Sequence, residues 1–402
     1  MKPLFRRPVH NLTPLYCLHQ GAVSFAYAGI ASFAVAYLMS RGFNPALIGA
    51  MLAATSILSC VLQPLIGSYV DRRSMTLLPG MILGFQSLVF VCLAAIEALP
   101  LPMPLIGVLF TAGYLSFLMA LSLNNSLCAH YSQNGFAINY GMGAGVGALA
   151  FSLGSLGIGY VAGRLGERWA ILISLALTVL DMLLILFYPR VRPEDEAAVR
   201  LRKSGAAQSL SIPAFCSRYR LFMATIAGTM CLAACHTALE NFLIQIFSRI
   251  GGGSEEVGVA LFAAGVSSAP FLLCFERVQK RIGVEVLVRL SGVFFMLKAL
   301  LMLFASTIPS VYLICMLQTV SYGFVSPALY YLVLRRVGSA DMAKGQMLSS
   351  ALYTLGGGMG NWAAGAMIEY KGLNAMLLMV AGFAALGTIL INFTLSAEQK
   401  KA

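Results

Sequence analysis

WAILISLALTVLDMLLILFY, residues 169–188, is a run of 20 residues in which Asp181 is the only charged side chain. A helix needs about 20 residues to cross the hydrocarbon core of a bilayer. Because lipid offers no hydrogen-bonding partners, a spanning segment must pair its backbone polar groups internally, as an α-helix does. The run therefore predicts a membrane-spanning helix.

Eleven similar runs fill most of the remaining sequence. The chain is 59% hydrophobic and only 10% charged, which is too little charge to cover the surface of a soluble protein of 402 residues. We therefore expect an all-α membrane protein with twelve transmembrane helices. The predicted spans are Pro14–Met39, Ala46–Val70, Thr76–Leu99, Pro104–His130, Ala137–Gly163, Trp169–Tyr188, Phe222–Phe247, Val257–Glu276, Val286–Ser306, Val311–Leu334, Met342–Met367 and Ala375–Leu395.

Lys and Arg residues are distributed unequally between alternate loops. With a cytosolic N-terminus, 21 of the 27 lie on the cytosolic side and Lys298 lies within a span. Five lie outside, namely Arg41, Arg164, Arg168, Arg249 and Lys371. The positive-inside rule then predicts cytosolic termini in the plasma (inner) membrane. It also explains the net charge of +12 without a nucleic-acid partner.

The first apolar run is too long for a signal peptide and has no clear small-residue cleavage site, so we expect it to remain as the first span. The nine cysteines form no CxxC pair, and no metal, cofactor or ATP-binding motif is present. We expect no enzymatic activity.

The chain divides into two similar halves. The charged stretch Pro189–Arg220 separates six spans from six, which predicts bundles at 1–188 and 221–402 joined by a cytosolic linker at 189–220. Phe151-Ser152-Leu153-Gly154 in the fifth span matches Tyr353-Thr354-Leu355-Gly356 in the eleventh. Such duplication is typical of transporters whose substrate site lies between two repeats at mid-membrane.

The loop after the second span contains Gly67-Ser68-Tyr69-Val70-Asp71-Arg72-Arg73. It resembles the G-x-x-x-D-R signature of the major facilitator superfamily, and the resemblance covers nearly the whole chain. It implies the major facilitator fold, in which two six-helix bundles are related by pseudo-two-fold symmetry. It also implies a gating role for Gly67, Asp71 and Arg72. A charged helix end that only fixes topology is the alternative.

Gln63-Pro64-Leu65-Ile66-Gly67, Lys280-Arg281-Ile282-Gly283 and Asn241-Phe242 resemble the lactose-permease-like, nucleoside-symporter-like and phenylpropionate-permease-like group. Sugar symport in lactose permease requires an Arg, a His and a Glu in spans nine and ten. Here Lys298 lies near the Arg position, and Gln318 and Ser321 lie near the other two. The resemblance therefore does not extend to lactose-type recognition.

Four polar residues within spans require an explanation, because a charge at mid-helix costs about 2.5–3.5 kcal/mol on insertion scales. Lys298 is expected to face an anionic substrate or a coupling carboxylate, with a structural ion pair as the alternative. Glu240 and His236 share a helix face at i, i+4 and form the first candidate for proton coupling, with an interfacial pair at the external mouth as the alternative. Asp181 is the next candidate, with a structural acid as the alternative.

Neutral polar residues complete the candidate site. Any one of them alone could equally be an interhelical hydrogen bond. The expected substrate-binding residues, with Lys298, are Tyr27, Asn124, Asn241, Gln318, Tyr322 and Asn361.

We therefore expect a secondary active transporter that takes up a small organic solute, with protons as the coupling ion, by alternating access. The protein is expected to be monomeric in the lipid bilayer. Drug or metabolite efflux is the first alternative, although Gly157-Ile158-Gly159 lacks the proline that many efflux members carry in span five. A transporter-like membrane sensor is the second.

Overall fold

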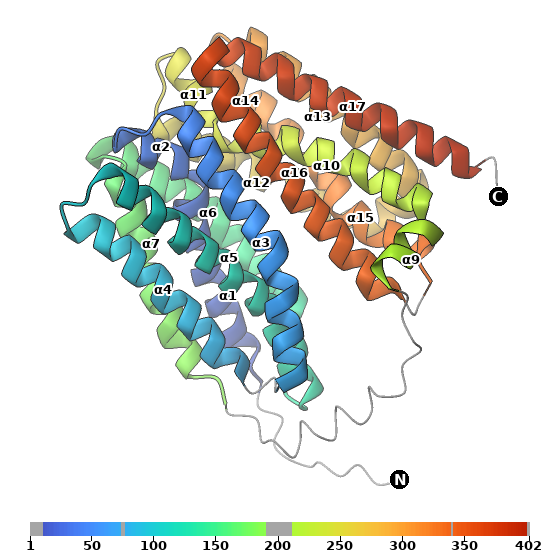
Figure 1. Ribbon diagram of the computed structural model, residues 1–402, viewed down its shortest axis with the longest axis horizontal. Helices are drawn as coiled ribbons and strands as arrows, with labels where there is room; N and C mark the ends of the chain where they lie inside the picture. Colours follow the sequence, from blue (N-terminus) through green and yellow to red (C-terminus); the bar gives the residue numbers. More distant parts are fainter. Residues whose placement is uncertain (1–10, 74–76, 190–210, 339–340, 400–402) are drawn as a thin grey trace. The chain divides into compact units, whose positions relative to one another are not determined.

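The computed structural model describes residues 11–73, 77–189, 211–338 and 341–399 (Figure 1). These residues are almost entirely helical. They contain no strand, and the one bridge pair joins Asn11 and Ala137. The all-α class expected from the sequence is confirmed.

The helices follow the predicted spans closely. In the first half they are α1 (Thr13–Tyr27), the π-helical turn η1 (Ala28–Ser32), α2 (Ala34–Ser40), α3 (Pro45–Arg73), α4 (Leu78–Ala98), α5 (Met103–Gln133), α6 (Tyr140–Leu165) and α7 (Arg168–Leu186).

The second half begins with a short helix in the last part of the predicted linker. Its helices are α9 (Ile212–Arg218), α10 (Arg220–Asn241), α11 (Leu243–Arg249), α12 (Ser254–Ile282), α13 (Val284–Phe304), α14 (Ile308–Met316), the 3₁₀ turn η3 (Leu317–Thr319), α15 (Tyr322–Arg336), α16 (Met342–Lys371) and α17 (Leu373–Gln399).

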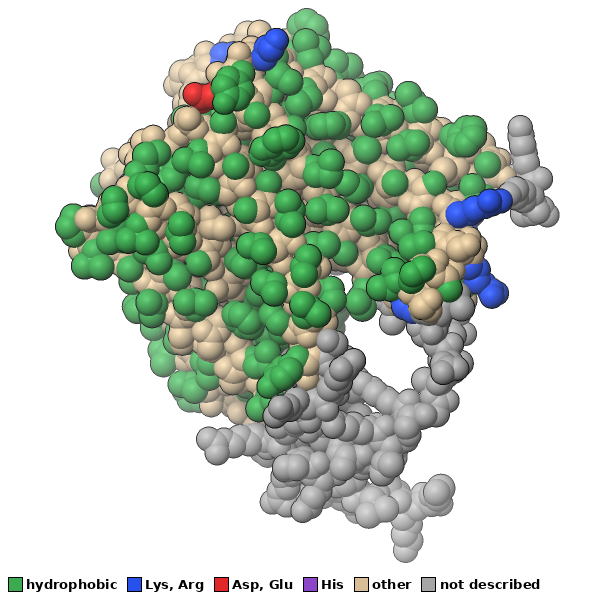
Figure 2. Space-filling model, in the orientation of Figure 1, with side chains coloured by type: hydrophobic (Ala, Val, Ile, Leu, Met, Phe, Trp, Pro, Cys, Tyr) green, Lys and Arg blue, Asp and Glu red, His purple; other side chains and the backbone are tan. Residues whose placement is uncertain are grey.

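Ten of the described helical segments are long and apolar enough to cross a membrane, and the bent pair formed by α1–η1 and α2 makes eleven. The eleventh predicted span lies in α16, a continuous helix of 30 residues whose Gly, Ser and Asn content makes it less apolar. The structure is therefore consistent with twelve spans. Figure 2 shows hydrophobic side chains spread over the visible face, as a lipid-facing surface requires.

Three spans that the sequence predicted as continuous are broken. The first bends by 49° after η1. The seventh is interrupted at Phe242, between α10 and α11. The tenth contains η3 between α14 and α15, where the Ser321 hydroxyl donates a hydrogen bond to the Leu317 carbonyl at 2.9 Å. A hydroxyl that bonds to the preceding turn competes with regular helical hydrogen bonding.

Packing divides the chain into two units that do not follow the sequence halves. Unit 1 comprises residues 1–30, 61–154 and 171–206, and unit 2 comprises residues 31–60, 155–170 and 207–402. Unit 2 thus combines the second half of the chain with α2 and parts of α3, α6 and α7. The predicted boundary at 189–220 stays a prediction, because residues 190–210 lie outside the described residues.

The core of unit 1 is built on apolar residues of α4, α5 and α7. Ile82, Leu127 and Ile185 belong to one buried cluster that also contains Tyr131 and Tyr188. The sequence 141–147 of α6, with four alternating glycines, lies against α1. A Cβ atom at Gly143 would overlap the Tyr16 ring, so only glycine permits this approach.

In unit 2, α10 lies at the centre, between α16 and α17 (Figure 1). A Cβ atom at Gly360 of α16 would overlap the backbone of Ala234. On the other side, one at Gly387 of α17 would come within 2.6 Å of the Gly228 carbonyl oxygen. Backbones that meet without intervening side chains are a common way to pack membrane helices, which gain little from burial against lipid.

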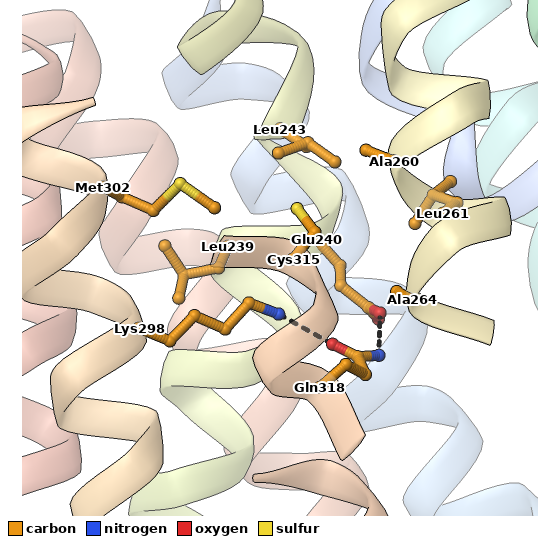
Figure 3. Close-up of a pocket in the computed structure, with 10 residues that line it drawn as sticks. All are labelled: Leu239, Glu240, Leu243, Ala260, Leu261, Ala264, Lys298, Met302, Cys315 and Gln318. Atoms are coloured by element: carbon orange, nitrogen blue, oxygen red, sulfur yellow. Dashed lines mark hydrogen bonds between the residues drawn. The ribbon is translucent and has the colours of Figure 1, made fainter. Parts of the chain in front are cut away.

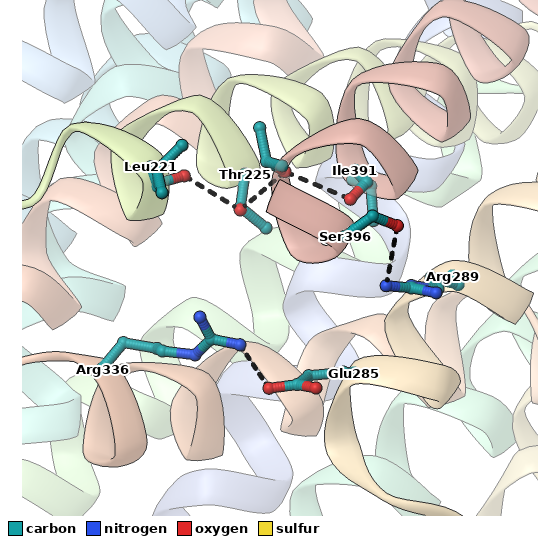
Figure 4. A network of polar contacts seen from close by, with 8 residues as sticks. Leu221, Thr225, Glu285, Arg289, Arg336, Ile391 and Ser396 are labelled. Atoms are coloured by element: carbon teal, nitrogen blue, oxygen red, sulfur yellow. Dashed lines mark hydrogen bonds and ion pairs between the residues drawn. The ribbon is translucent and has the colours of Figure 1, made fainter. Parts of the chain in front are cut away.

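Polar contacts join α10, α13, α15 and α17 (Figure 4). The Thr225 hydroxyl of α10 lies 3.0 Å from that of Thr394 of α17. Arg289 of α13 donates to Ser396 of α17 at 3.3 Å, and an ion pair joins Arg336 of α15 to Glu285 of α13. These contacts hold the first turns of α13 against α15 and α17, and Lys298 lies further along the same helix.

Candidate functional site

Three polar side chains predicted separately meet in unit 2 (Figure 3). Glu240 extends from the last turn of α10, Lys298 from the middle of α13, and Gln318 from η3. The break in the tenth span places Gln318 between the other two side chains. A discontinuous helix is the usual way in which transporters place polar groups at mid-membrane.

Gln318 bridges a cation and an anion. The Lys298 ammonium donates to the Gln318 amide oxygen at 2.7 Å, and the Gln318 amide nitrogen donates to Glu240 Oε1 at 2.6 Å. The charges fix the orientation of the amide, since its oxygen must face the ammonium and its nitrogen the carboxylate. Lys298 is only 3% exposed. The bridge therefore compensates a buried positive charge that would otherwise have no partner among the residues described here.

A histidine and a tyrosine extend the bridge. His236 Nε2 lies 3.3 Å from Glu240 Oε2, one helical turn away on α10. The His236 ring stacks on Tyr322 at a centroid distance of 4.4 Å and an interplanar angle of 22°. The Glu240 side chain keeps 32% of its surface exposed, whereas that of His236 keeps 7%. Glu240 is therefore the member of the pair that water can reach more readily.

A cavity adjoins the bridge and is lined mainly by apolar residues of α10, α11, α12 and α13, among them Leu243, Ala260, Leu261 and Met302. It encloses about 10 Å³, which admits about one water molecule. In the conformation described, this space is too small for an organic solute.

A second polar contact lies beside the first. The Asn241 amide nitrogen of α10 donates to the Asn361 amide oxygen of α16 at 3.0 Å. These two predicted substrate-binding residues are thus in contact with each other and close in sequence to Glu240. Their hydrogen bond joins α10 to α16 at the point where α10 ends.

The remaining predicted binding residues lie in unit 1. Tyr27 of α1 stacks on Phe117 of α5, with ring centroids 6.0 Å apart, and contacts Phe151 of α6 at 5.9 Å. Asn124 of α5 is fully buried, and neither of its amide atoms has a hydrogen-bond partner among the described residues.

Asp181 lies in a different cluster of unit 1. Its Oδ1 atom is 2.6 Å from His19 Nδ1 of α1, and its Oδ2 atom accepts a hydrogen bond from the Gln86 amide of α4 at 2.7 Å. All three residues are at most 1% exposed. This geometry fits the structural alternative that the sequence left open for Asp181, and its role in coupling stays a prediction.

His19 and Gln86 were not among the predicted site residues. A histidine in the first apolar run and a glutamine in the third indicate polar contacts between helices, since buried polar groups need hydrogen-bond partners. Nothing in the spacing showed that both would meet Asp181.

The predicted gating residues Gly67, Asp71 and Arg72 belong to the last turns of α3, whose backbone is helical up to Arg73. Their side chains lie outside the described residues, and so does Ser74. The gating role stays a prediction.

Within unit 2, the part of α6 beyond residue 154 meets the start of α12. A Cβ atom at Gly159 would lie 2.7 Å from the Gly258 Cα atom, and one at Gly163 would lie 3.0 Å from the Glu255 backbone nitrogen. The first half of α3 meets α16 in the same way, because a Cβ atom at Gly365 would overlap the Pro45 carbonyl. Helices from the two sequence halves are thus in direct backbone contact.

Solved structures of similar fold are transporters. A mutant form of the nucleoside transporter NupG matches with a TM-score of 0.80 and 15% identity, over 96% of this chain and 100% of that one. A POT family transporter in complex with a thioalcohol conjugated peptide has a TM-score of 0.70 and 12% identity, over 94% and 95%. A POT family transporter in complex with 5-aminolevulinic acid has a TM-score of 0.69 and 11% identity, again over 94% and 95%. At these identities the likeness shows the fold alone.

No curated protein matches the sequence significantly. The family model of the Major Facilitator Superfamily matches residues 21–361, which is most of the chain. The match includes the predicted signature after the second span and every residue of the Glu240–Gln318–Lys298 bridge. The chain belongs to the Major Facilitator Superfamily, and it is a multi-pass membrane transporter of small solutes rather than an enzyme.

Proposed function

We propose that this protein is a proton-coupled symporter that takes up a small organic solute, and that Glu240 carries the coupling proton. The bridge between Glu240, Gln318 and Lys298 is the observation that supports this proposal. It places one ionisable carboxyl, still reachable by water, in contact with a buried cation.

The coupling follows from charge balance. With Glu240 ionised, the cation of Lys298 is compensated through the Gln318 amide. Protonation of Glu240 removes that compensation and leaves Lys298 as a buried charge without a counter-ion, which is strongly unfavourable. An anionic group of the solute can then take the place of the carboxylate. Binding of the proton thus favours binding of the solute, and the reverse also holds.

Alternating access requires the two sequence halves to close on one side of the membrane and open on the other. The glycine contacts between α6 and α12, and between α3 and α16, are suited to such a closure. Two helices that meet at glycines have no interlocking side chains there, so they can separate without changing any side-chain rotamer. Asp71 and Arg72, at the opposite end of α3, are proposed to latch the cytosolic side.

The proposed orientation places both termini and the 189–220 linker in the cytosol of a plasma-membrane protein, because of the 21-to-5 distribution of Lys and Arg. In intact cells, a Ser204→Cys variant should not react with a membrane-impermeant maleimide. Ser204→Cys should react once the membrane is permeabilised, which serves as the positive control. Reaction in sealed cells would reverse the orientation.

The proposed function is tested by uptake into proteoliposomes with and without an inward proton gradient. The named neighbours suggest nucleosides, small peptides and amino-acid-like acids as test solutes, with sugars and aromatic acids to widen the panel. At least one solute should accumulate only when the gradient is present. Accumulation that a protonophore leaves intact would contradict proton coupling.

A further inference from the structure

Glu167 lies in the short connection between α6 and α7, at the side expected to be external, and faces the start of α12. Its Oε1 atom accepts a hydrogen bond from the Ser254 hydroxyl at 2.6 Å. Its Oε2 atom is buried and has no hydrogen-bond partner among the described residues. A buried carboxylate oxygen without a hydrogen-bond partner has lost its hydration and gained no protein contact in its place, which disfavours the ionised form of the carboxyl.

The packing around Glu167 explains why its Oε2 atom is buried although the residue as a whole is partly exposed. Gly159 and Gly163 of α6 bring this helix into contact with the backbone of α12 at Gly258 and Glu255. Ser254, the first residue of α12, is itself 1% exposed. Separation of α6 from α12 would therefore hydrate the Glu167 carboxyl and Ser254 together.

The charges around Glu167 come from three helices. Arg164 of α6 lies 3.8 Å from Glu255 of α12, and both side chains are largely exposed. Arg168 begins α7, and Glu256 of α12 accepts a hydrogen bond from the Gly253 backbone N–H at 2.6 Å. The first turn of α12 thus already contains two carboxylates, Glu255 and Glu256, which interact favourably with the positive N-terminal end of the helix. A third negative charge there gains little from the helix and is repelled by the other two.

We propose that Glu167 is a proton-sensitive latch of the external closure: protonation of its carboxyl favours the closed contact with Ser254, and ionisation favours opening. This inference rests on the proposed alternating-access function but concerns a group in neither the Glu240 site nor the signature of α3. It makes external acidity a signal that returns the transporter to the externally closed state.

The direction of the pH dependence follows from burial. In the closed conformation burial raises the pKa of Glu167, and the hydrogen bond from Ser254 offsets part of this rise. In an opened conformation water would return the carboxyl to its ordinary pKa. Closing therefore takes up a proton between the two pKa values. The contribution to closure is fully present at low pH and is lost as the pH rises through the pKa of the closed form.

The test measures opening and does not depend on transport. Ser155 of α6 is fully buried, and its carbonyl faces Gly258 of α12, so a Ser155→Cys reporter should react with an impermeant external maleimide only when this closure opens. The same chain without the reporter gives the background of the nine native cysteines. Rates are measured from pH 5.5 to 8 in the reporter chain with and without Glu167→Gln. Their ratio removes the pH dependence of the thiol reaction itself.

The ratio of the rate with Glu167 to the rate with Glu167→Gln should rise with pH, by up to about tenfold per pH unit, because one proton is linked to closure. The exposed Glu255→Gln is the matched control and should keep this rise, moved somewhat to lower pH because one carboxylate that repels Glu167 is removed. Ser254→Ala removes the hydrogen-bond donor that favours the ionised form of Glu167, so it should move the rise to higher pH. This variant replaces Glu167→Gln as the test if Glu167→Gln does not fold.

A ratio that stays flat with pH, or a rise that disappears when both chains also carry Glu255→Gln, would overturn the proposal. A pH-dependent ratio in a protein that moves no solute would support the latch and contradict only the proposed transport function. The two proposals can thus fail separately.

Discussion

Replacing Glu240 by glutamine is expected to abolish uphill accumulation while preserving exchange of solute down its gradient. Glutamine cannot bind and release the coupling proton, but its amide oxygen can still accept the hydrogen bond that Gln318 donates. With one proton per cycle, a gradient of one pH unit drives up to about tenfold accumulation in the wild type. In Glu240→Gln proteoliposomes the internal concentration should not exceed the external one. Counterflow is measured beside pH-driven uptake.

Glu276→Gln is the matched control for this change. Glu276 lies on α12 in the same unit, is exposed, and contacts the Tyr331 hydroxyl rather than Lys298. This variant should accumulate solute as the wild type does. If uphill uptake survives in Glu240→Gln, Glu240 does not couple the proton, and Asp181 becomes the next candidate.

Replacing Lys298 by glutamine is expected to weaken binding of anionic solutes far more than binding of neutral ones. A hydrogen bond to a charged group contributes about 1.5–3 kcal/mol, so the apparent binding constant for anions should rise about ten- to hundredfold. Neutral solutes should change little, because glutamine can still donate a hydrogen bond at this position. The binding constants come from competition for uptake across matched acid and amide pairs.

Arg289→Gln provides the comparison, because it removes one positive charge from the same helix at the Ser396 contact, away from the Glu240 site. Its effect on anions and neutral solutes should be small and equal. An anion preference that is the same in Lys298→Gln as in the wild type would leave Lys298 as a structural cation of the bridge.

The spans could be predicted from sequence because their physical cause is local. Trp169–Tyr188, for example, is apolar for the full thickness of a bilayer, and the structure has α7 at Arg168–Leu186. The interruptions could not be predicted as well. The break at η3 depends on local hydrogen bonds such as that of Ser321 and leaves the hydropathy of the span almost unchanged.

The candidate site was predicted residue by residue but not as an assembly. Charge within an apolar span marked Lys298 and Glu240, and the i, i+4 spacing correctly placed His236 beside Glu240. That Gln318 connects the two charges depends on how α10, α13 and η3 pack, which no local pattern encodes. The contact of Asp181 with His19 was missed for the same reason, since it joins residues of the first and sixth spans.

The burial of Glu167 could not be predicted from the sequence, for a different reason. Glu167 lies in a loop beside Arg164 and Arg168, where a carboxylate would be expected to be solvated and ionised. The close approach of α6 to α12, at Gly163 beside Glu255 and at Gly159 beside Gly258, accounts for the burial of its Oε2 atom. Burial in a loop depends on tertiary packing, and hydropathy does not report it.

Proton movement during solute entry tests the proposed coupling most directly. Proteoliposomes in lightly buffered medium receive an accepted solute with no pH gradient imposed, and the external pH is followed. The bridge between Glu240, Gln318 and Lys298 predicts that the medium becomes more alkaline as protons enter with the solute, and that Glu240→Gln removes this change while solute still exchanges. Net solute entry through the wild-type protein with no accompanying proton influx would contradict it.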